Sequence, residues 1–88
     1  MTAEKIYAAQ GSMKGEINLQ WDAVTKARYY IIQAAHYNKQ NWKHVDIISD
    51  SQYTLSGLSS GKIYSFRIAP VFETGQGPWS EPAEKKVK

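Results

Sequence analysis

The chain has 88 residues, of which 42% are hydrophobic and 22% charged, the composition of one small globular domain rather than of a disordered chain. It has no cysteine, which excludes disulfides and cysteine-based zinc sites, and its net charge of +3 is too small to indicate a nucleic-acid-binding protein. No apolar run approaches the roughly 18 residues of a membrane span, so we expect no membrane insertion.

Alternation of apolar and polar residues with a period of two runs along most of the chain, and helical patterns are nearly absent. Ile17, Leu19 and Trp21 alternate with polar residues, which indicates a half-buried strand. The other strands predicted, in chain order, are residues 4–10, 28–37, 42–48, 52–55, 62–72 and 79–87. Gly, Asn, Asp, Ser and Pro gather between these segments, where turns are needed. Seven short strands predict an all-β fold, an antiparallel β-sandwich.

Four motifs in this order resemble the fibronectin type III domain. Trp21 before Asp22-Ala23 is similar to that family's second-strand tryptophan, and residues 27–32 (ARYYII) are similar to its third strand. Residues 58–64 (LSSGKIY) resemble the tyrosine corner, Leu-x-Pro-Gly-x-x-Tyr, and residues 75–80 (GQGPWS) resemble a Gly-x-Gly-Pro-x-Ser motif between the last two strands. The resemblance implies one immunoglobulin-like sandwich over residues 1–88, with sheets ABE and C′CFG, and these structural residues: Trp21, Tyr30, Ile32, Leu58, Gly61, Tyr64, Phe66 and Ile68.

The tyrosine corner carries a specific expectation. The Tyr64 ring would turn into the core while its hydroxyl bonds a backbone group upstream in a buried hydrogen bond. Gly61 suits a turn position with positive φ. Two residues depart from the family pattern: Ser60 stands where proline is usual, and Pro70 lies late in the sixth strand. Because proline cannot donate to a strand ladder, we expect a bulge or the end of regular pairing at Pro70.

No catalytic or cofactor-binding pattern is present, so we expect a protein that is not an enzyme and holds no cofactor. His36 and His44 are the only histidines. If Tyr37 faces Trp42 across the hairpin, His36 pairs with Lys43 and His44 with Ala35, and the histidines point to opposite faces. We therefore expect no metal site, although a one-residue slip would bring the two imidazoles together.

The same register predicts an aromatic surface on the outer face of the second sheet. Its candidate binding residues are Tyr29, Ile31, Tyr37, Trp42, His44 and Arg67, with Gln33, Ala35, Ser65, Ala69 and Val71 on the same face. Clustered exposed aromatic and apolar groups mark interaction sites, and Arg67 could lie over an exposed ring. The alternative is that these cross-strand pairs only stabilise the sheet.

A second candidate surface is the loop near the last strand. Phe72, Gln76 and Trp79 flank residues 73–78, a loop that often binds ligands in the resembled family. The alternative for Trp79 is a loop anchor that folds back onto the sandwich. No Arg-Gly-Asp tripeptide is present to support integrin-type adhesion.

These patterns favour a monomeric, non-enzymatic module of a larger protein, at the cell surface or outside the cell. Such a module would space or present neighbouring domains of the same chain and could bind another protein. Two alternatives stay open: an accessory domain of a secreted bacterial polysaccharide-degrading enzyme, with sugar rings stacked on Tyr37, Trp42 and Trp79, or an engineered binding scaffold. The Lys-rich end at residues 85–88 is expected to be solvated.

Overall fold

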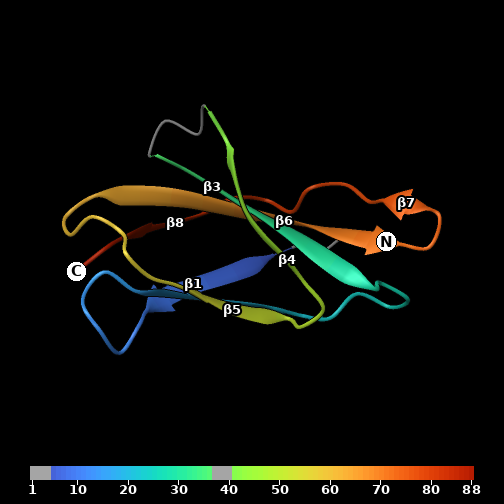
Figure 1. The fold of residues 1–88 in the computed structure, drawn as a ribbon, viewed down its shortest axis with the longest axis horizontal. Coiled ribbons are helices and arrows are strands. Elements are labelled where there is room, and N and C mark those ends of the chain that lie inside the picture. The colour runs from blue at the N-terminus through green and yellow to red at the C-terminus, as the bar shows by residue number, and fades with distance from the viewer. Residues whose placement is uncertain (1–4, 37–40) are drawn as a thin grey trace.

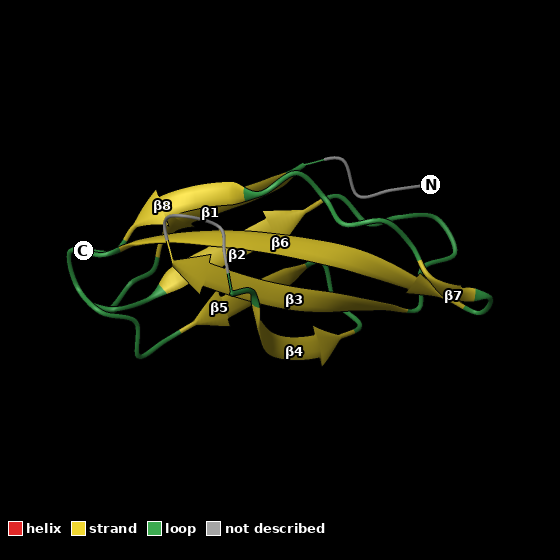
Figure 2. Ribbon diagram, turned by 90° about the horizontal axis from the view of Figure 1, so that it is seen from above, coloured by secondary structure: helices red, strands yellow, loops and turns green. Residues whose placement is uncertain are grey.

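The computed structural model describes residues 5–36 and 41–88, which form eight antiparallel strands and no helix. The strands are β1 (Ile6–Gln10), β2 (Ile17–Trp21), β3 (Tyr29–His36), β4 (Lys43–Ile48), β5 (Gln52–Leu55), β6 (Ile63–Phe72), β7 (Gly75–Gln76) and β8 (Ala83–Lys86). One sheet has the order β1-β2-β5, and the other has the order β4-β3-β6-β7, with β8 also paired to β6 (Figures 1 and 2). The predicted immunoglobulin-like sandwich, with sheets ABE and C′CFG, is confirmed.

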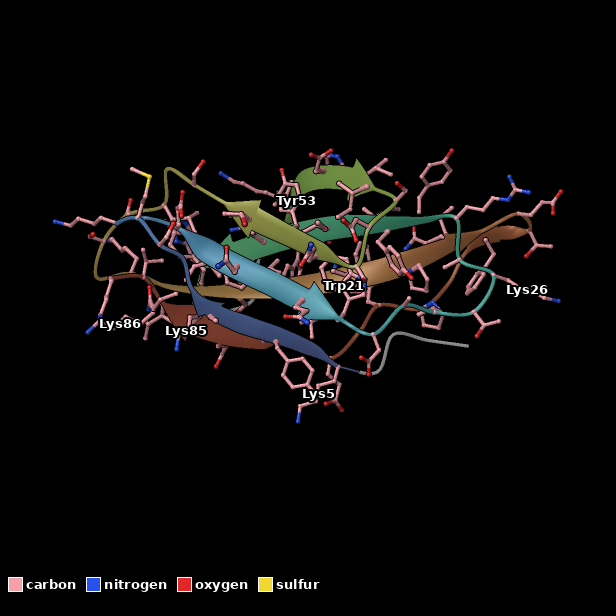
Figure 3. The ribbon with its side chains drawn as sticks, turned by 90° about the horizontal axis from the view of Figure 1, so that it is seen from below. Lys5, Trp21, Lys26, Tyr53, Lys85 and Lys86 are labelled. Atoms are coloured by element: carbon pink, nitrogen blue, oxygen red, sulfur yellow. The ribbon has the colours of Figure 1, made fainter. Side chains whose placement is uncertain are left out.

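The core lies between the two sheets and is built by the alternation seen in the sequence. Ile17, Leu19 and Trp21 are buried, while Asn18 and Gln20 between them are exposed. The Trp21 ring meets the Tyr30 ring edge-on, with centroids 5.4 Å apart. Figure 3 shows Trp21 inside the sandwich and lysines at its periphery. The core cluster also includes Ile6, Val24, Ile32, Leu55, Phe66, Ile68 and Val87.

The tyrosine corner forms, but its hydrogen bond is exposed rather than buried. Tyr64 packs against the core, and its hydroxyl accepts from the Ser59 N–H at 3.1 Å. Gly61 has a φ of +82°, the left-handed conformation expected at that turn. Leu58 also packs against the core and is partly buried. Because Tyr64 is half-buried at the end of the sandwich, water reaches its hydroxyl, and the expectation of a buried bond is wrong.

Pro70 interrupts pairing on one side of β6 only. The ladder with β3 continues through Tyr30↔Pro70 and Tyr29↔Val71 without a bulge, so the expectation of an interruption is wrong on that side. On the other side the last strand breaks into β7 and β8, where one strand over residues 79–87 was predicted. The backbone N–H groups of a strand point alternately to its two neighbours, and those of the even-numbered β6 residues point to the last strand. Pro70 is even-numbered and has no N–H, so the missing donor is on the side of the last strand.

The register of β3 and β4 differs from the predicted one by two residues. His44 pairs with Gln33 rather than Ala35, and Lys43 pairs with Ala34 rather than His36. The pairing also shifts between Ile32 and Gln33, so one residue of β4, Val45, has no partner there. An even shift keeps His44 on the predicted outer face, but the bulge reverses the faces of the residues after Val45.

β1 links the region of Trp21 to the region of the C-terminus. β1 begins beside Trp21, because Ile6 pairs with that residue. At the opposite end of β1, Gln10 donates to the Lys86 carbonyl and accepts from the Lys88 N–H. β1 therefore runs from near the middle of the long axis, where Figure 3 labels Lys5, toward the end of the sandwich at which the C-terminus lies in Figure 1.

Candidate functional site

The outer face of the five-stranded sheet holds an arginine between two tryptophans. The Arg67 Cζ lies 4.3 Å from the Trp42 ring centroid and 4.2 Å from the Trp79 ring centroid. Both distances are well within cation–π range. Arg67 is on β6, Trp42 directly precedes β4, and Trp79 lies between β7 and β8. We call this arrangement the Trp42–Arg67–Trp79 stack; it confirms that Arg67 lies over aromatic rings.

Gln33 fixes the position of the guanidinium in this stack. Gln33 is opposite Arg67 in the β3–β6 register, and its Oε1 accepts from Arg67 Nε at 2.9 Å and from Nη2 at 2.7 Å. Burial lowers the pKa of the Arg67 guanidinium below its usual value. Within residues 5–36 and 41–88 the ion pair found is Arg28–Glu73, so Arg67 meets no carboxylate there.

Two hydrogen bonds of Ser80 bring Trp79 to the stack. Ser80 is buried, its N–H donates to the Ile68 carbonyl at 2.7 Å, and its hydroxyl accepts from the Ile68 N–H at 3.0 Å. These bonds hold the irregular segment against β6, one residue from Arg67. Trp79 is therefore a loop anchor that folds back onto the sheet, as one of the two interpretations of the sequence proposed.

An apolar patch lies beside the stack on the same face. It consists of Tyr29, Ile31, Ile47 and Val71, joined by the register pairs Ile31↔Ile47 and Tyr29↔Val71. Tyr29 is 50% exposed and Ile47 is 53% exposed, although both are large and hydrophobic. Ala35 and Ala69, predicted on this face, are buried there. Sequence reasoning missed Ile47 because only the bulge at Val45 turns it outward.

Comparison with known proteins agrees with this architecture. The model of the family "Fibronectin type III domain" matches residues 7–86.

The chain belongs to the fibronectin type III family.

A relative from Danio rerio, "Receptor-type tyrosine-protein phosphatase F", is 37% identical over 74 residues, which cover 81% of this chain and only 4% of the phosphatase. Among solved structures, an Fn3-like protein from Clostridium thermocellum has a TM-score of 0.88 at 20% identity, covering 100% of this chain and 94% of that one. The structure titled "Titin kinase and its flanking domains" has a TM-score of 0.83 at 21% identity, covering 97% of this chain and 16% of that one. A fibronectin type III domain is a modular sandwich that recurs within larger proteins.

The structure brings together only part of the predicted sheet-face site. Trp42 and Arg67 meet in the stack, and Tyr29 and Ile31 belong to the apolar patch. His44 is exposed on the same face, opposite Gln33. Tyr37 lies outside the described residues. Gln33 was predicted on this face without a role, and its position opposite Arg67 is the sequence signal that could have identified one.

The predicted loop site of this fibronectin type III domain is not a single surface. Phe72 packs against the core cluster, because it lies on the same face of β6 as Phe66 and Ile68. Gln76 is exposed in β7, and Trp79 lies on the outer face over Arg67. The turn is at residues 73–74, within the predicted loop of residues 73–78, and Gly75 already pairs with Phe72.

The two histidines occupy opposite faces. His36 stacks on Tyr64 at the end of the inner face, with ring centroids 5.2 Å apart, while His44 points outward opposite Gln33. In the part of the chain that the structure describes, no three His, Asp or Glu side chains gather closely enough to hold a metal ion. The same residues contain no helix that could span a bilayer.

Proposed function

We propose that this fibronectin type III domain is a non-enzymatic module that separates neighbouring domains of a longer chain and binds a partner protein through its apolar patch. One observation supports the spacer role: the matched segment is only 4% of the phosphatase relative, so that relative is many times longer than this chain. The "receptor-type" description of that relative supports a position outside the cell or at its surface.

The observation that carries the binding role is that two groups of residues on the outer face differ in their contacts. The Trp42–Arg67–Trp79 stack uses one face of each indole internally, so these aromatics stabilise the sheet. Tyr29 and Ile47 have no such role and leave half of their surface in water. Exposed apolar groups side by side on a rigid sheet are typical of the centre of a protein interface.

The sugar-stacking alternative for Trp42 and Trp79 is less well supported. A sugar ring stacks on an open aromatic face, and Arg67 occupies one face of each indole. The residues that would bind a protein are different ones, Tyr29 and Ile47. We propose no nucleic acid partner. A nucleic-acid-binding face needs clustered Lys and Arg, and Arg67 is already held between two indoles and by Gln33.

A comparison of one double variant with a single-variant control tests the proposal. The complete chain, immobilised, would be used to capture proteins from its own source, and each captured protein would be purified and rebound. Tyr29→Asp/Ile47→Asp should abolish rebinding of the true partner, because charge on the apolar patch is costly to desolvate. Tyr7→Asp, an exposed tyrosine on the other sheet, is the matched control and should bind normally. Equal rebinding by both variants contradicts the proposed surface.

The oligomeric state gives a second test. We propose a monomer, measurable by sedimentation equilibrium. A stable dimer would contradict this, and its dissociation by Ile47→Asp would identify a second copy of the chain as the occupant of the apolar patch.

A further inference from the structure

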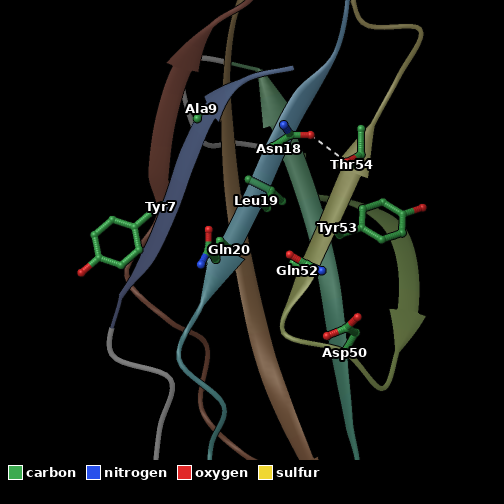
Figure 4. Close-up of a pocket in the computed structure, with 9 residues that line it drawn as sticks. All are labelled: Tyr7, Ala9, Asn18, Leu19, Gln20, Asp50, Gln52, Tyr53 and Thr54. Carbon is green, nitrogen blue, oxygen red and sulfur yellow. Dashed lines mark hydrogen bonds between the residues drawn. The ribbon is translucent and has the colours of Figure 1, made fainter. Parts of the chain in front are cut away.

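A shallow hollow of about 610 Å³ lies on the outer face of the three-stranded sheet, on the side of the molecule opposite the Trp42–Arg67–Trp79 stack. Figure 4 shows it over β1, β2 and β5, with the Tyr7 ring at one edge of the sheet and the Tyr53 ring at the other. Its lining residues are Tyr7, Ala9, Asn18, Leu19, Gln20, Asp50, Gln52, Tyr53 and Thr54.

The outward-facing residues of this sheet carry no charge. The strand registers align them in two rows across the sheet, Tyr7–Gln20–Gln52 and Ala9–Asn18–Thr54. A solvated sheet face ordinarily carries interspersed Lys and Glu, and 22% of this chain is charged. The lining includes one carboxylate, that of Asp50. The Asp50 Oδ1 accepts from the Ser51 N–H. An uncharged face of amides is the feature that needs an explanation.

The amides of the hollow have hydrogen-bonding capacity to spare. Asn18 Oδ1 accepts from Thr54 Oγ1 at 2.7 Å, which leaves the Asn18 NH₂ group as a donor. The side chains of Gln20 and Gln52 make no hydrogen bond to any described residue, and both are exposed. As register partners on one face they lie about 5 Å apart at Cβ. Each carboxamide offers two donors and one acceptor to a ligand.

An aromatic ring completes the hollow. Tyr7 is 55% exposed and stands beside Gln20 in the first row. Lys5 Nζ lies 5.6 Å from the centroid of the Tyr7 ring, outside the lining. The Tyr53 hydroxyl is already used, because it donates to Asp46 Oδ2 at 3.0 Å. Lys5 thus lies over one face of the Tyr7 ring, but at 55% exposure Tyr7 still contributes open apolar surface, and the two glutamines contribute the free polar groups.

We propose that this hollow binds a neutral linear polysaccharide. Sugar rings have hydroxyls that both donate and accept, which matches free carboxamides, and apolar C–H faces, which match an exposed tyrosine ring. The lining contains no cation to recognise an anionic polymer, and it is too polar for the centre of a protein interface. This surface is independent of the apolar patch, so either proposal can fail alone.

Titration of the complete ¹⁵N-labelled chain with cellohexaose, xylohexaose and mannohexaose tests the proposal. At least one of these probes should shift the side-chain amide signals of Gln20 and Gln52. The double variant Gln20→Ala/Gln52→Ala should weaken that binding about tenfold or more, because two hydrogen-bonding groups are lost. Tyr7→Ala should also weaken it, whereas Tyr29→Ala, the matched tyrosine on the opposite sheet, should stay within about twofold.

Three outcomes overturn the proposal. The first is the absence of amide shifts with all three hexasaccharides at millimolar concentration. The second is binding that survives in the double glutamine variant with its thermal unfolding unchanged. The third is binding lost equally in Tyr29→Ala, which would place the sugar on the other sheet. Because all substituted residues are exposed, the variants are expected to fold, and their backbone amide spectra outside β1, β2 and β5 verify this.

Discussion

Ser80 and Ile68 exchange two hydrogen bonds where the last strand is broken. The Ser80 hydroxyl accepts from the Ile68 N–H, and the Ser80 N–H donates to the Ile68 carbonyl. A side chain thus replaces the backbone carbonyl that an unbroken strand would have supplied. The position matters because Ile68 is fully buried, and an unpaired N–H would have no access to water.

Ser80→Ala is expected to destabilise the domain by about 1–3 kcal/mol, because the buried Ile68 N–H loses its acceptor. Urea unfolding followed by tryptophan fluorescence measures the change. Ser56→Ala, at an exposed serine, is the control and should change stability by less than about 0.5 kcal/mol. Equal effects of the two substitutions would show that the Ser80 hydroxyl is not needed as an acceptor.

Arg67→Lys is expected to cost about 1–2 kcal/mol and to shift tryptophan emission to longer wavelength. Lysine keeps the charge but loses the planar group that stacks on both indoles and binds Gln33 with two N–H groups. Denaturant unfolding and the emission spectrum of the folded state provide the measurements. Arg28→Lys, at an exposed ion pair, should be nearly neutral. An unchanged spectrum in Arg67→Lys would contradict the stack.

Tyr30→Phe is expected to be more costly than Tyr64→Phe. The Tyr30 hydroxyl accepts from the buried Val24 N–H at 2.8 Å, so its removal should cost about 1–3 kcal/mol. The Ser59 N–H that Tyr64 accepts from is exposed and can bond to water instead, so that substitution should cost less than about 1 kcal/mol. Both variants keep the aromatic ring. A larger loss for Tyr64→Phe would restore the buried tyrosine corner expected from the sequence.

Stability at alkaline pH should depend on Tyr53. Burial raises the pKa of Tyr53 above 10.0, and the hydrogen bond to Asp46 and its negative charge raise it further. The folded state therefore holds the phenolic proton more tightly than the unfolded state. This contribution is fully present below pH 10 and is lost as pH rises through the raised pKa.

The free energy of unfolding should accordingly fall more steeply above pH 10 in the wild type than in Tyr53→Phe. Asp46→Asn should lower the Tyr53 pKa, because it removes the charge that opposes phenolate formation. Phenolate absorbance and urea unfolding at several pH values give the two quantities. Identical pH slopes in the wild type and Tyr53→Phe would exclude a contribution from this pair.

The strands were predictable because each one buries a single face. Alternation in β2 placed Trp21 and Leu19 inside and Gln20 outside, and the same pattern in β6 placed Arg67 outside. Gly61 was predictable from its turn, since few other residues adopt a positive φ. These features are local, so the sequence contains the information that sets them.

The bulge at Val45 was not predictable, and neither was the exposure of Ile47 that follows from it. A bulge depends on how the side chains of two paired strands pack over several residues, and no residue type in β4 predicts it. The break between β7 and β8 had a partial signal in Pro70, but the strand edge affected depended on the pairing order of the whole sheet.

By itself, the amino-acid sequence determined which family the chain resembles and, outside the bulged strand β4, which residues face the core, because side-chain direction in a regular strand follows from a period of two. Only the tertiary structure decided which outward residues meet. Trp42, Arg67 and Trp79 come from three separate segments, and their contact requires the β3–β6 register and the Ser80–Ile68 bonds. Such contacts depend on long-range pairing, which no short window of sequence specifies.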